Sequence, residues 1–305
     1  MIRDEERIKE RICKLKEERN AVILAHNYQL GEIQEIADFR GDSLELSRKA
    51  QETKAEVIVF CGVDFMAETA AILNPEKIVL LPDPSAKCPM AAMVNPERLK
   101  EERRKNPDAA VVCYVNTSAA VKAESDICCT SANFLQIIRN IEAEKIIFVP
   151  DWCMGYLASK RTGKKIILYP GYCPAHLRIE PSRIREFRKL HPEAKILVHP
   201  ECKPEVAELA DEVLGTGGMC RYVRESEVRE FVIGTEIGMI WRLRMERPDK
   251  RFFPLSEQAI CPQMKLISLE KVERALERLE PRVEVPEEVR ERAEIAIRRM
   301  LELPS

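Results

Sequence analysis

The sequence predicts an α/β protein built from three homologous three-layer α/β domains, each with a short parallel sheet, arranged with pseudo-threefold symmetry around a central site. Three observations predict this fold. Strand-like runs alternate with helical segments, three of these runs end in a polar cluster, and a Cys-Pro pair closes each of three segments. The pairs begin at Cys88, Cys173 and Cys261, at intervals of 85 and 88 residues. Self-similarity at such a long period indicates duplicated units, each large enough to be a small α/β domain.

The expected parts of the chain follow from this period. They are an N-terminal helix at 1–20, α/β repeats at 21–105, 106–190 and 191–265, and C-terminal helices at 266–305. The charged segments at both ends have the Glu and Arg alternation of solvated helix faces.

The first repeat sets the order of elements. Apolar spacing predicts strands at 21–26, 56–62 and 77–83, with helical segments at 31–39, 43–53 and 65–74 between them. The other two repeats follow the same order and close on strands at 164–170 and 250–256. Continuous apolar strands alternating with helices favour parallel sheets, here of three strands, covered by helices on both faces.

Polar triplets mark the ends of the first strand in each repeat. They are His26-Asn27-Tyr28, Tyr114-Val115-Asn116 and His199-Pro200-Glu201. A hydroxyl residue follows 15 positions after each triplet, as Ser43, Ser131 and Thr216. An acidic residue then ends the second long strand, as Asp64, Asp151 and Glu236, for which we expect a structural role at a helix start. Because ligands bind at the carboxyl ends of parallel strands, the triplets and the cysteines should meet in one central site.

Composition bounds the class of protein. The 305 residues are 45% hydrophobic and 33% charged, with a formal net charge of −2, so we expect neither a nucleic-acid nor a membrane partner. No apolar run approaches the ~20 residues that span a bilayer, and the N-terminal segment is unlike a signal peptide, so we expect a cytoplasmic protein. The odd count of eleven cysteines favours reduced thiols or metal ligands over disulfides.

Three convergent thiolates suit two kinds of metal centre. Catalytic zinc uses three protein ligands and a water, whereas a cubane iron–sulfur cluster with three cysteines leaves one iron without a protein ligand. Spacing alone favours the cluster only modestly. The remaining cysteines are expected to be packing or surface residues. His176, three residues after Cys173, suits either a place beside the metal or a structural role.

The ordered motifs resemble the quinolinate synthase family over nearly the whole chain. They run from LAHNYQLGEIQEIADFRGDSLELSRKA through FCGVDFMAETA, YVNTSA, CTSAN, GYCPAH, VHPEC and GTGGM to FVIGTEIGM and CPQM. The resemblance implies a 4Fe-4S cluster held by Cys88, Cys173 and Cys261, whose open iron acts as a Lewis acid. It also implies a transferase of NAD biosynthesis that condenses iminoaspartate with dihydroxyacetone phosphate to give quinolinate, phosphate and two waters. An aspartate-oxidising enzyme would supply the first substrate.

The resemblance also assigns site residues. Tyr28, Glu201 and His199 are expected to be catalytic, with Tyr28 and Glu201 as the proton-transfer pair. Substrate contacts are expected from His26, Ser43, Tyr114, Val115, Asn116, Ser131, His199, Pro200, Glu201 and Thr216. The chain departs from the common Ser-Thr-Gly of relatives at Gly215-Thr216-Gly217, which leaves one hydroxyl fewer.

Two other functions remain open at this point. An open-cluster hydro-lyase acting on a hydroxy acid would use the same cysteines and similar bases, without dihydroxyacetone phosphate. A non-enzymatic iron–sulfur carrier would need no ring of acid, base and hydroxyl groups around the metal, whereas every repeat of this chain supplies such groups.

Overall fold

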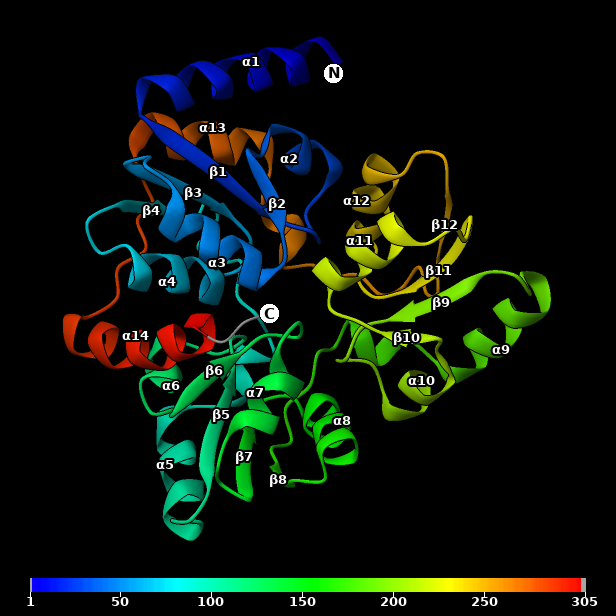
Figure 1. The fold of residues 1–305 in the computed structure, drawn as a ribbon. Helices are drawn as coiled ribbons and strands as arrows, with labels where there is room; N and C mark the ends of the chain where they lie inside the picture. The colour runs from blue at the N-terminus through cyan, green and yellow to red at the C-terminus, as the bar shows by residue number, and fades with distance from the viewer. Residues whose placement is uncertain (1, 303–305) are drawn as a thin grey trace.

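The computed structural model describes residues 2–302, and within them three parallel sheets surround a common centre (Figure 1). The first repeat supplies the blue and cyan elements of the figure. After the N-terminal helix α1 (Ile2–Glu18), they are in chain order β1 (Ala21–His26), α2 (Gly31–Ile36), β2 (Phe39–Gly41), α3 (Ser43–Glu52), β3 (Val57–Cys61), α4 (Asp64–Leu73), β4 (Ile78–Leu80), the short 3-10 helix η1 (Ala91–Met93) and α5 (Pro96–Lys105).

The second and third repeats follow the same order of elements. The second consists of β5 (Ala110–Tyr114), α6 (Ala119–Lys122), β6 (Ile127–Cys129), α7 (Phe134–Asn140), β7 (Lys145–Val149), α8 (Trp152–Thr162), β8 (Lys165–Leu168), η2 (His176–Arg178) and α9 (Pro181–Leu190). The third consists of β9 (Lys195–Val198), α10 (Pro204–Leu209), β10 (Glu212–Val213), α11 (Thr216–Glu225), β11 (Glu230–Gly234), α12 (Gly238–Glu246), β12 (Arg251–Pro254), η3 (Met264–Leu266) and α13 (Leu269–Arg278). The helix α14 (Glu287–Glu302) completes the described chain.

The three sheets share one strand order, which confirms the predicted α/β fold of three repeats. The orders are β2-β1-β3-β4, β6-β5-β7-β8 and β10-β9-β11-β12, and every pairing is parallel. The central strands are buried along almost their whole length, as expected for sheets covered on both faces.

The expectation of three strands per sheet was wrong, because each sheet has a fourth, short edge strand. These strands, β2, β6 and β10, have only two or three residues, too few to produce a hydrophobic alternation in the sequence. An aspartate precedes each of them and accepts a hydrogen bond from an amide of the neighbouring strand. The three pairs are Asp38 with Ile23, Asp126 with Val111 and Asp211 with Ile196, at 2.8, 2.7 and 2.8 Å.

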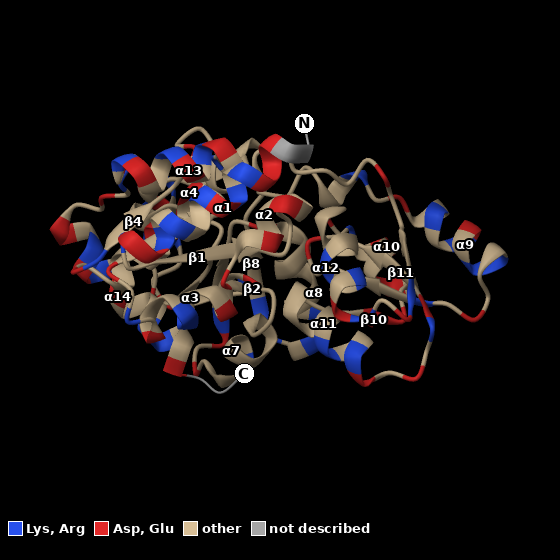
Figure 2. Cartoon of the chain, turned by 90° about the horizontal axis from the view of Figure 1, so that it is seen from above, with Lys and Arg blue, Asp and Glu red and all other residues tan. Residues whose placement is uncertain are grey.

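The terminal helices lie on the outside of the repeats. The helix α1 packs beside α13, and α14 packs against α4, α6 and β6, so it joins the first two repeats. Lys, Arg, Asp and Glu gather on these helices, whereas the strands are mostly uncharged (Figure 2). Among the described residues, no helix combines the length and apolar character needed to cross a membrane.

Candidate functional site

One cavity lies where the carboxyl ends of the three sheets meet, and all three Cys-Pro cysteines line it. It encloses about 580 Å³ including its mouth. The predicted residues that line it are His26, Tyr28, Ser43, Tyr114, Asn116, Ser131, His199, Glu201, Thr216, Cys88, Cys173 and Cys261. Val115 and Pro200 are not among the residues that line it. The cavity therefore unites side chains as far apart in sequence as His26 and Met264, which are separated by 238 positions.

The acidic residues of the repeats hold the cysteine loops in place. The Asp64 carboxylate accepts a hydrogen bond from the backbone amide of Cys88 at 3.1 Å, and the Glu236 carboxylate accepts one from the amide of Cys261 at 3.0 Å. In the second repeat, Asp151 caps α8 through the amide of Met154 at 2.7 Å. These contacts agree with the structural role expected for the three acids.

The thiols themselves offer a soft donor set. Burial raises the pKa of the Cys88 thiol, and the neighbouring Cys261 and Glu201 raise it further. Burial also raises the pKa of Cys173 and of Cys261. Thiols bind metal as thiolates, so a cation at this point would have to displace their protons. Three cysteines facing one another, with no fourth cysteine in the cavity lining, fit a thiolate-bound metal or cluster that keeps an open position.

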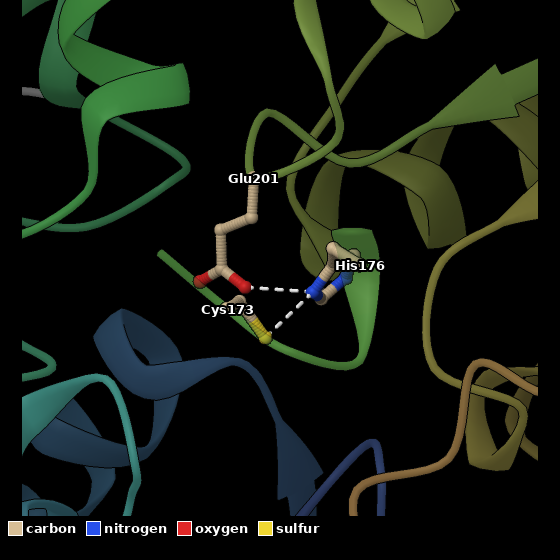
Figure 3. A group of neighbouring side chains, drawn as sticks. All are labelled: Cys173, His176 and Glu201. Atoms are coloured by element: carbon tan, nitrogen blue, oxygen red, sulfur yellow. Dashed lines mark hydrogen bonds and ion pairs between the residues drawn. The ribbon is translucent and has the colours of Figure 1, made fainter. Parts of the chain in front are cut away.

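A chain of hydrogen bonds crosses the cavity and connects Tyr28 with Glu201. The Tyr28 hydroxyl lies 2.6 Å from Thr235 Oγ1, which lies 2.8 Å from Nε2 of His176. Nδ1 of His176 lies 2.8 Å from Oε2 of Glu201, and Figure 3 shows this contact beside the one from His176 to Cys173. Oε1 of Glu201 accepts the hydroxyl of Tyr114 at 2.5 Å. All three repeats contribute to this chain.

The protons of this chain can be assigned from its acceptors. An ionised Glu201 only accepts hydrogen bonds, so Nδ1 of His176 is the donor. When the His176 ring is neutral, its Nε2 accepts from the Thr235 hydroxyl, which leaves Thr235 to accept from Tyr28. His176 thus contacts Cys173, Glu201 and Thr235 at once, a placement that its spacing from Cys173 left open.

Glu201 is held as a carboxylate in a buried place. Burial by itself would raise the pKa of Glu201, but His176 and the hydrogen bonds from His176 and Tyr114 lower it overall. Both tyrosines behave in the opposite way, because burial and the nearby Glu201 charge raise the pKa of Tyr28 and of Tyr114. The site therefore places one ionised carboxylate between two tyrosines that keep their protons.

The histidines at the strand ends are neutral and share one orientation. Burial lowers the pKa of His26 and of His199 to about 3. Nδ1 of His26 accepts the amide of Tyr28 at 3.2 Å, and Nδ1 of His199 accepts the amide of Glu201 at 3.3 Å. Each neutral ring therefore carries its proton on Nε2, which is left to donate to a bound molecule.

The three hydroxyl residues mark helix starts at the cavity. Ser43 and Thr216 are the first residues of α3 and α11, and Ser131 lies shortly before α7. The capping positions are filled by Asp42, Gly215 and Asn133, so the hydroxyls are not the N-cap residues. A Cβ at Gly215 would lie 2.8 Å from Oγ of Ser131, so glycine lets the second and third repeats approach closely.

Cys173, His176 and Glu201 also form a compact donor group, with ligand atoms within 4.8 Å of one another. Their mutual hydrogen bonds already use Nδ1 of His176. The other eight cysteines do not line the cavity, and seven of them are buried while Cys13 is exposed. Sequence reasoning missed Thr235 altogether. A signal was present in the sequence, because Thr235 is a polar residue directly before Glu236. The residues directly before the equivalent acids of the other repeats are Val63 and Pro150, which are apolar.

Thiols that meet at the axis of a triplicated α/β fold, beside a carboxylate and two tyrosines, define a class of enzymes with a metal-dependent or cluster-dependent centre. Comparison with known proteins is more specific. The family model described as "Quinolinate synthetase A protein" matches residues 10–302, and the chain belongs to this family. The family assignment confirms the resemblance seen in the sequence motifs.

Curated relatives agree over nearly their full length. "Quinolinate synthase" of Dehalococcoides mccartyi (strain CBDB1) is 57% identical over 296 residues, which cover 97% of this chain and 98% of the relative. "Quinolinate synthase 2" of Methanosarcina acetivorans is 53% identical over 301 residues, covering 99% and 97%. "Quinolinate synthase" of Geobacter sp. (strain M21) is 53% identical over 300 residues, covering 98% and 99%.

Proposed function

We propose that this enzyme condenses iminoaspartate with dihydroxyacetone phosphate to give quinolinate, phosphate and two waters. The observation that carries the proposal is the meeting of one cysteine from each repeat with Glu201 and Tyr28 in a single cavity. The full-length similarity to proteins named quinolinate synthase supports the same reaction. Iminoaspartate is the oxidised form of aspartate, so an aspartate-oxidising enzyme would supply it.

Cys88, Cys173 and Cys261 would hold a 4Fe-4S cluster, with one iron left open toward the cavity. When bound, such a cluster supplies a Lewis acid for a hydroxyl, carboxylate or amine group. The fit rests on the donor set, because three thiols face the cavity and two of their backbone amides are fixed by Asp64 and Glu236.

Glu201 would act as the general base. Forming the new carbon–carbon bond requires removal of a proton next to a carboxylate, and each dehydration requires removal of another. The lowered pKa of Glu201 keeps it ionised, while Tyr114 and His176 fix both of its oxygens. A base oriented in this way needs no rearrangement before it accepts a proton.

Tyr28 would act as the general acid. Its raised pKa keeps the hydroxyl protonated, and Thr235 orients it. A proton given to a leaving hydroxyl releases it as water. Thr235 and His176 connect Tyr28 to Glu201 by hydrogen bonds, which keeps the acid and the base in one fixed geometry.

The hydroxyls at the helix starts would bind the anionic groups of the substrates. Ser43 and Thr216 begin helices of ten residues, where free amides and the helix dipole favour carboxylate or phosphate oxygens. The Nε2 protons of His26 and His199 would add two more donors. Asn116, which faces Glu201 at 3.5 Å, would contact the substrate near the base.

The test is anaerobic reconstitution with iron and sulfide, followed by incubation with both substrates and with each one omitted. We expect quinolinate and phosphate in equal amounts only when both substrates are present. Absence of quinolinate from a fully loaded protein would sink the proposal. Turnover of a hydroxy acid without dihydroxyacetone phosphate would instead indicate a hydro-lyase, and intact cluster without any turnover would indicate a carrier.

A further inference from the structure

Lys265 connects Tyr28 to the loop that carries Cys261, and the proposed chemistry assigns it no role. Its ammonium group donates to the backbone carbonyl of Tyr28 and forms an ion pair with Glu236, at 2.9 Å to Oε1. The same Oε1 accepts the amide of Cys261 at 3.0 Å. The Glu236 side chain is fully buried and that of Lys265 is one-fifth exposed, so solvent screens the pair weakly.

Two consecutive residues of the third repeat hold the two ends of Tyr28. Thr235 contacts its hydroxyl at 2.6 Å, while Glu236 reaches its carbonyl through Lys265. The start of α12 packs on the same carbonyl, because a Cβ at Gly238 would lie 2.7 Å from the Tyr28 oxygen. Tyr28 belongs to the first repeat, so these contacts all cross from one repeat to another.

The lysine is specific to one repeat. Lys265 lies four residues after Cys261, and the equivalent positions after Cys88 and Cys173 are Ala92 and Leu177. The acids of the first and third repeats both accept a cysteine amide, yet within residues 2–302 only Glu236 of these two forms an ion pair with a lysine. A cysteine loop can therefore be held without a lysine, so Lys265 serves another contact.

We propose that the Glu236–Lys265 ion pair is a positioning device that fixes the Tyr28 loop against the Cys261 loop. It sets the distance between the Tyr28 hydroxyl and a group bound at the cysteines, without touching the substrate. Its catalytic consequence rests on the proposed function, but its structural consequence does not. A misplacement of about 1 Å costs about 10²-fold in rate, which is the size of effect expected from losing this tie.

The test compares Lys265→Met with Lys271→Met. Lys271 is a matched control because it also forms an ion pair, with Asp83 at 2.5 Å, and donates to a carbonyl, that of Leu266 at 2.7 Å, outside the cavity lining. Hydrogen–deuterium exchange of the segment 27–34 is measured in cluster-free and cluster-loaded protein. We expect about tenfold faster exchange in Lys265→Met and no change in Lys271→Met.

Kinetics and a double variant complete the test. Lys265→Met should lower kcat by about 10²-fold while KM changes little and cluster absorbance is retained, and Lys265→Arg should recover most of the rate. Because Lys265→Met alone leaves Glu236 buried without its partner, Glu236→Gln/Lys265→Met keeps the test valid if the single variant fails to fold. The double variant should show the same fast loop exchange.

Unchanged exchange in the segment 27–34 would overturn the proposal, whatever happens to kcat, because a rate loss alone would mean that Lys265 acts on the substrate. Equal effects of Lys265→Met and Lys271→Met would overturn it too. If wild-type protein makes no quinolinate, the proposed function fails, while the exchange measurement still decides whether the ion pair holds Tyr28.

Discussion

The first and third repeats end their first strands on a histidine, whereas the second repeat has a tyrosine at the same place. His26 and His199 each accept an amide from their own loop at Nδ1. Tyr114 instead reaches across to the third repeat and donates to Glu201. The fold therefore fixes the positions of these side chains, whereas their chemical roles differ between the repeats.

The cysteine positions, in contrast, are the same in every repeat. Each lies in the loop after the last strand of its sheet and faces the same cavity. Equivalent thiols suit a ligand that needs several identical donors, whereas acid and base catalysis needs groups of different pKa. The predictions below test this division between shared and specialised positions.

The largest effect is expected from the shared positions. Replacing Cys88, Cys173 or Cys261 singly by Ala should abolish the visible absorbance of the reconstituted cluster, because two thiolates cannot hold it. Cys129→Ala is the control, since Cys129 is buried in β6 away from the cavity lining. Loss of absorbance in Cys129→Ala, or its retention in any of the other three variants, would contradict the ligand assignment.

The next largest effect is expected from Glu201, the third residue of its polar triplet, in comparison with Asn116 at the equivalent position of the second repeat. Glu201→Gln removes the proposed base and should lower kcat by about 10²–10⁴-fold, with cluster absorbance unchanged. Asn116→Ala at the equivalent place of the second repeat should lower kcat far less, because this amide approaches Glu201 at 3.5 Å and is proposed to contact the substrate but not to transfer a proton. Steady-state kinetics on the loaded proteins measures both, and similar losses would show that the two positions are not specialised.

A smaller effect is expected from Tyr114→Phe. The variant loses one hydrogen bond to a charged group, which is worth about 1.5–3 kcal/mol. Because that hydrogen bond helps to lower the pKa of Glu201, its loss should raise this pKa. The acid limb of the pH profile of kcat/KM should then move to higher pH. An unmoved acid limb would mean that Tyr114 does not support Glu201 in the working enzyme.

The last prediction concerns stability against acid. The pKa of His26 is about 3 in the folded protein and about 6.5 when unfolded, so the unfolded state binds an extra proton between these values. The free energy of unfolding therefore falls as pH drops from about 6.5 to 3, by about 1.4 kcal/mol per pH unit for this histidine. His26→Asn should show a flatter pH dependence in denaturant titrations of cluster-free protein.

If His26→Asn keeps the pH dependence of the wild-type protein, the buried imidazole is not the source of the acid sensitivity.

Much of the site was predictable because it repeats. The cysteines, the strand-end triplets and the acids recur at fixed spacing, and parallel strands bring equivalent positions to one end of a sheet. Residues that occur in a single copy were harder to predict. Thr235 and Lys265 were missed, and the role of His176 was left open. Thr235, His176 and Lys265 have apolar residues at the equivalent places of the other repeats. Their roles depend on distances between repeats, which spacing along one chain does not encode.

The edge strands show the same limit at the level of the fold. Phe39–Gly41 and its counterparts are too short for a pattern, yet the aspartate before each one recurs 15 residues after the amide that it accepts. A repeated spacing was therefore present in the sequence, but its meaning depended on which strand lies beside which.

The most direct test of the central claim is a crystal structure of the anaerobically reconstituted protein with quinolinate bound. We expect a 4Fe-4S cluster on Cys88, Cys173 and Cys261, with quinolinate between its open iron and the helix starts at Ser43 and Thr216. A single metal ion on Cys173, His176 and Glu201, or quinolinate bound outside the central cavity, would contradict the account.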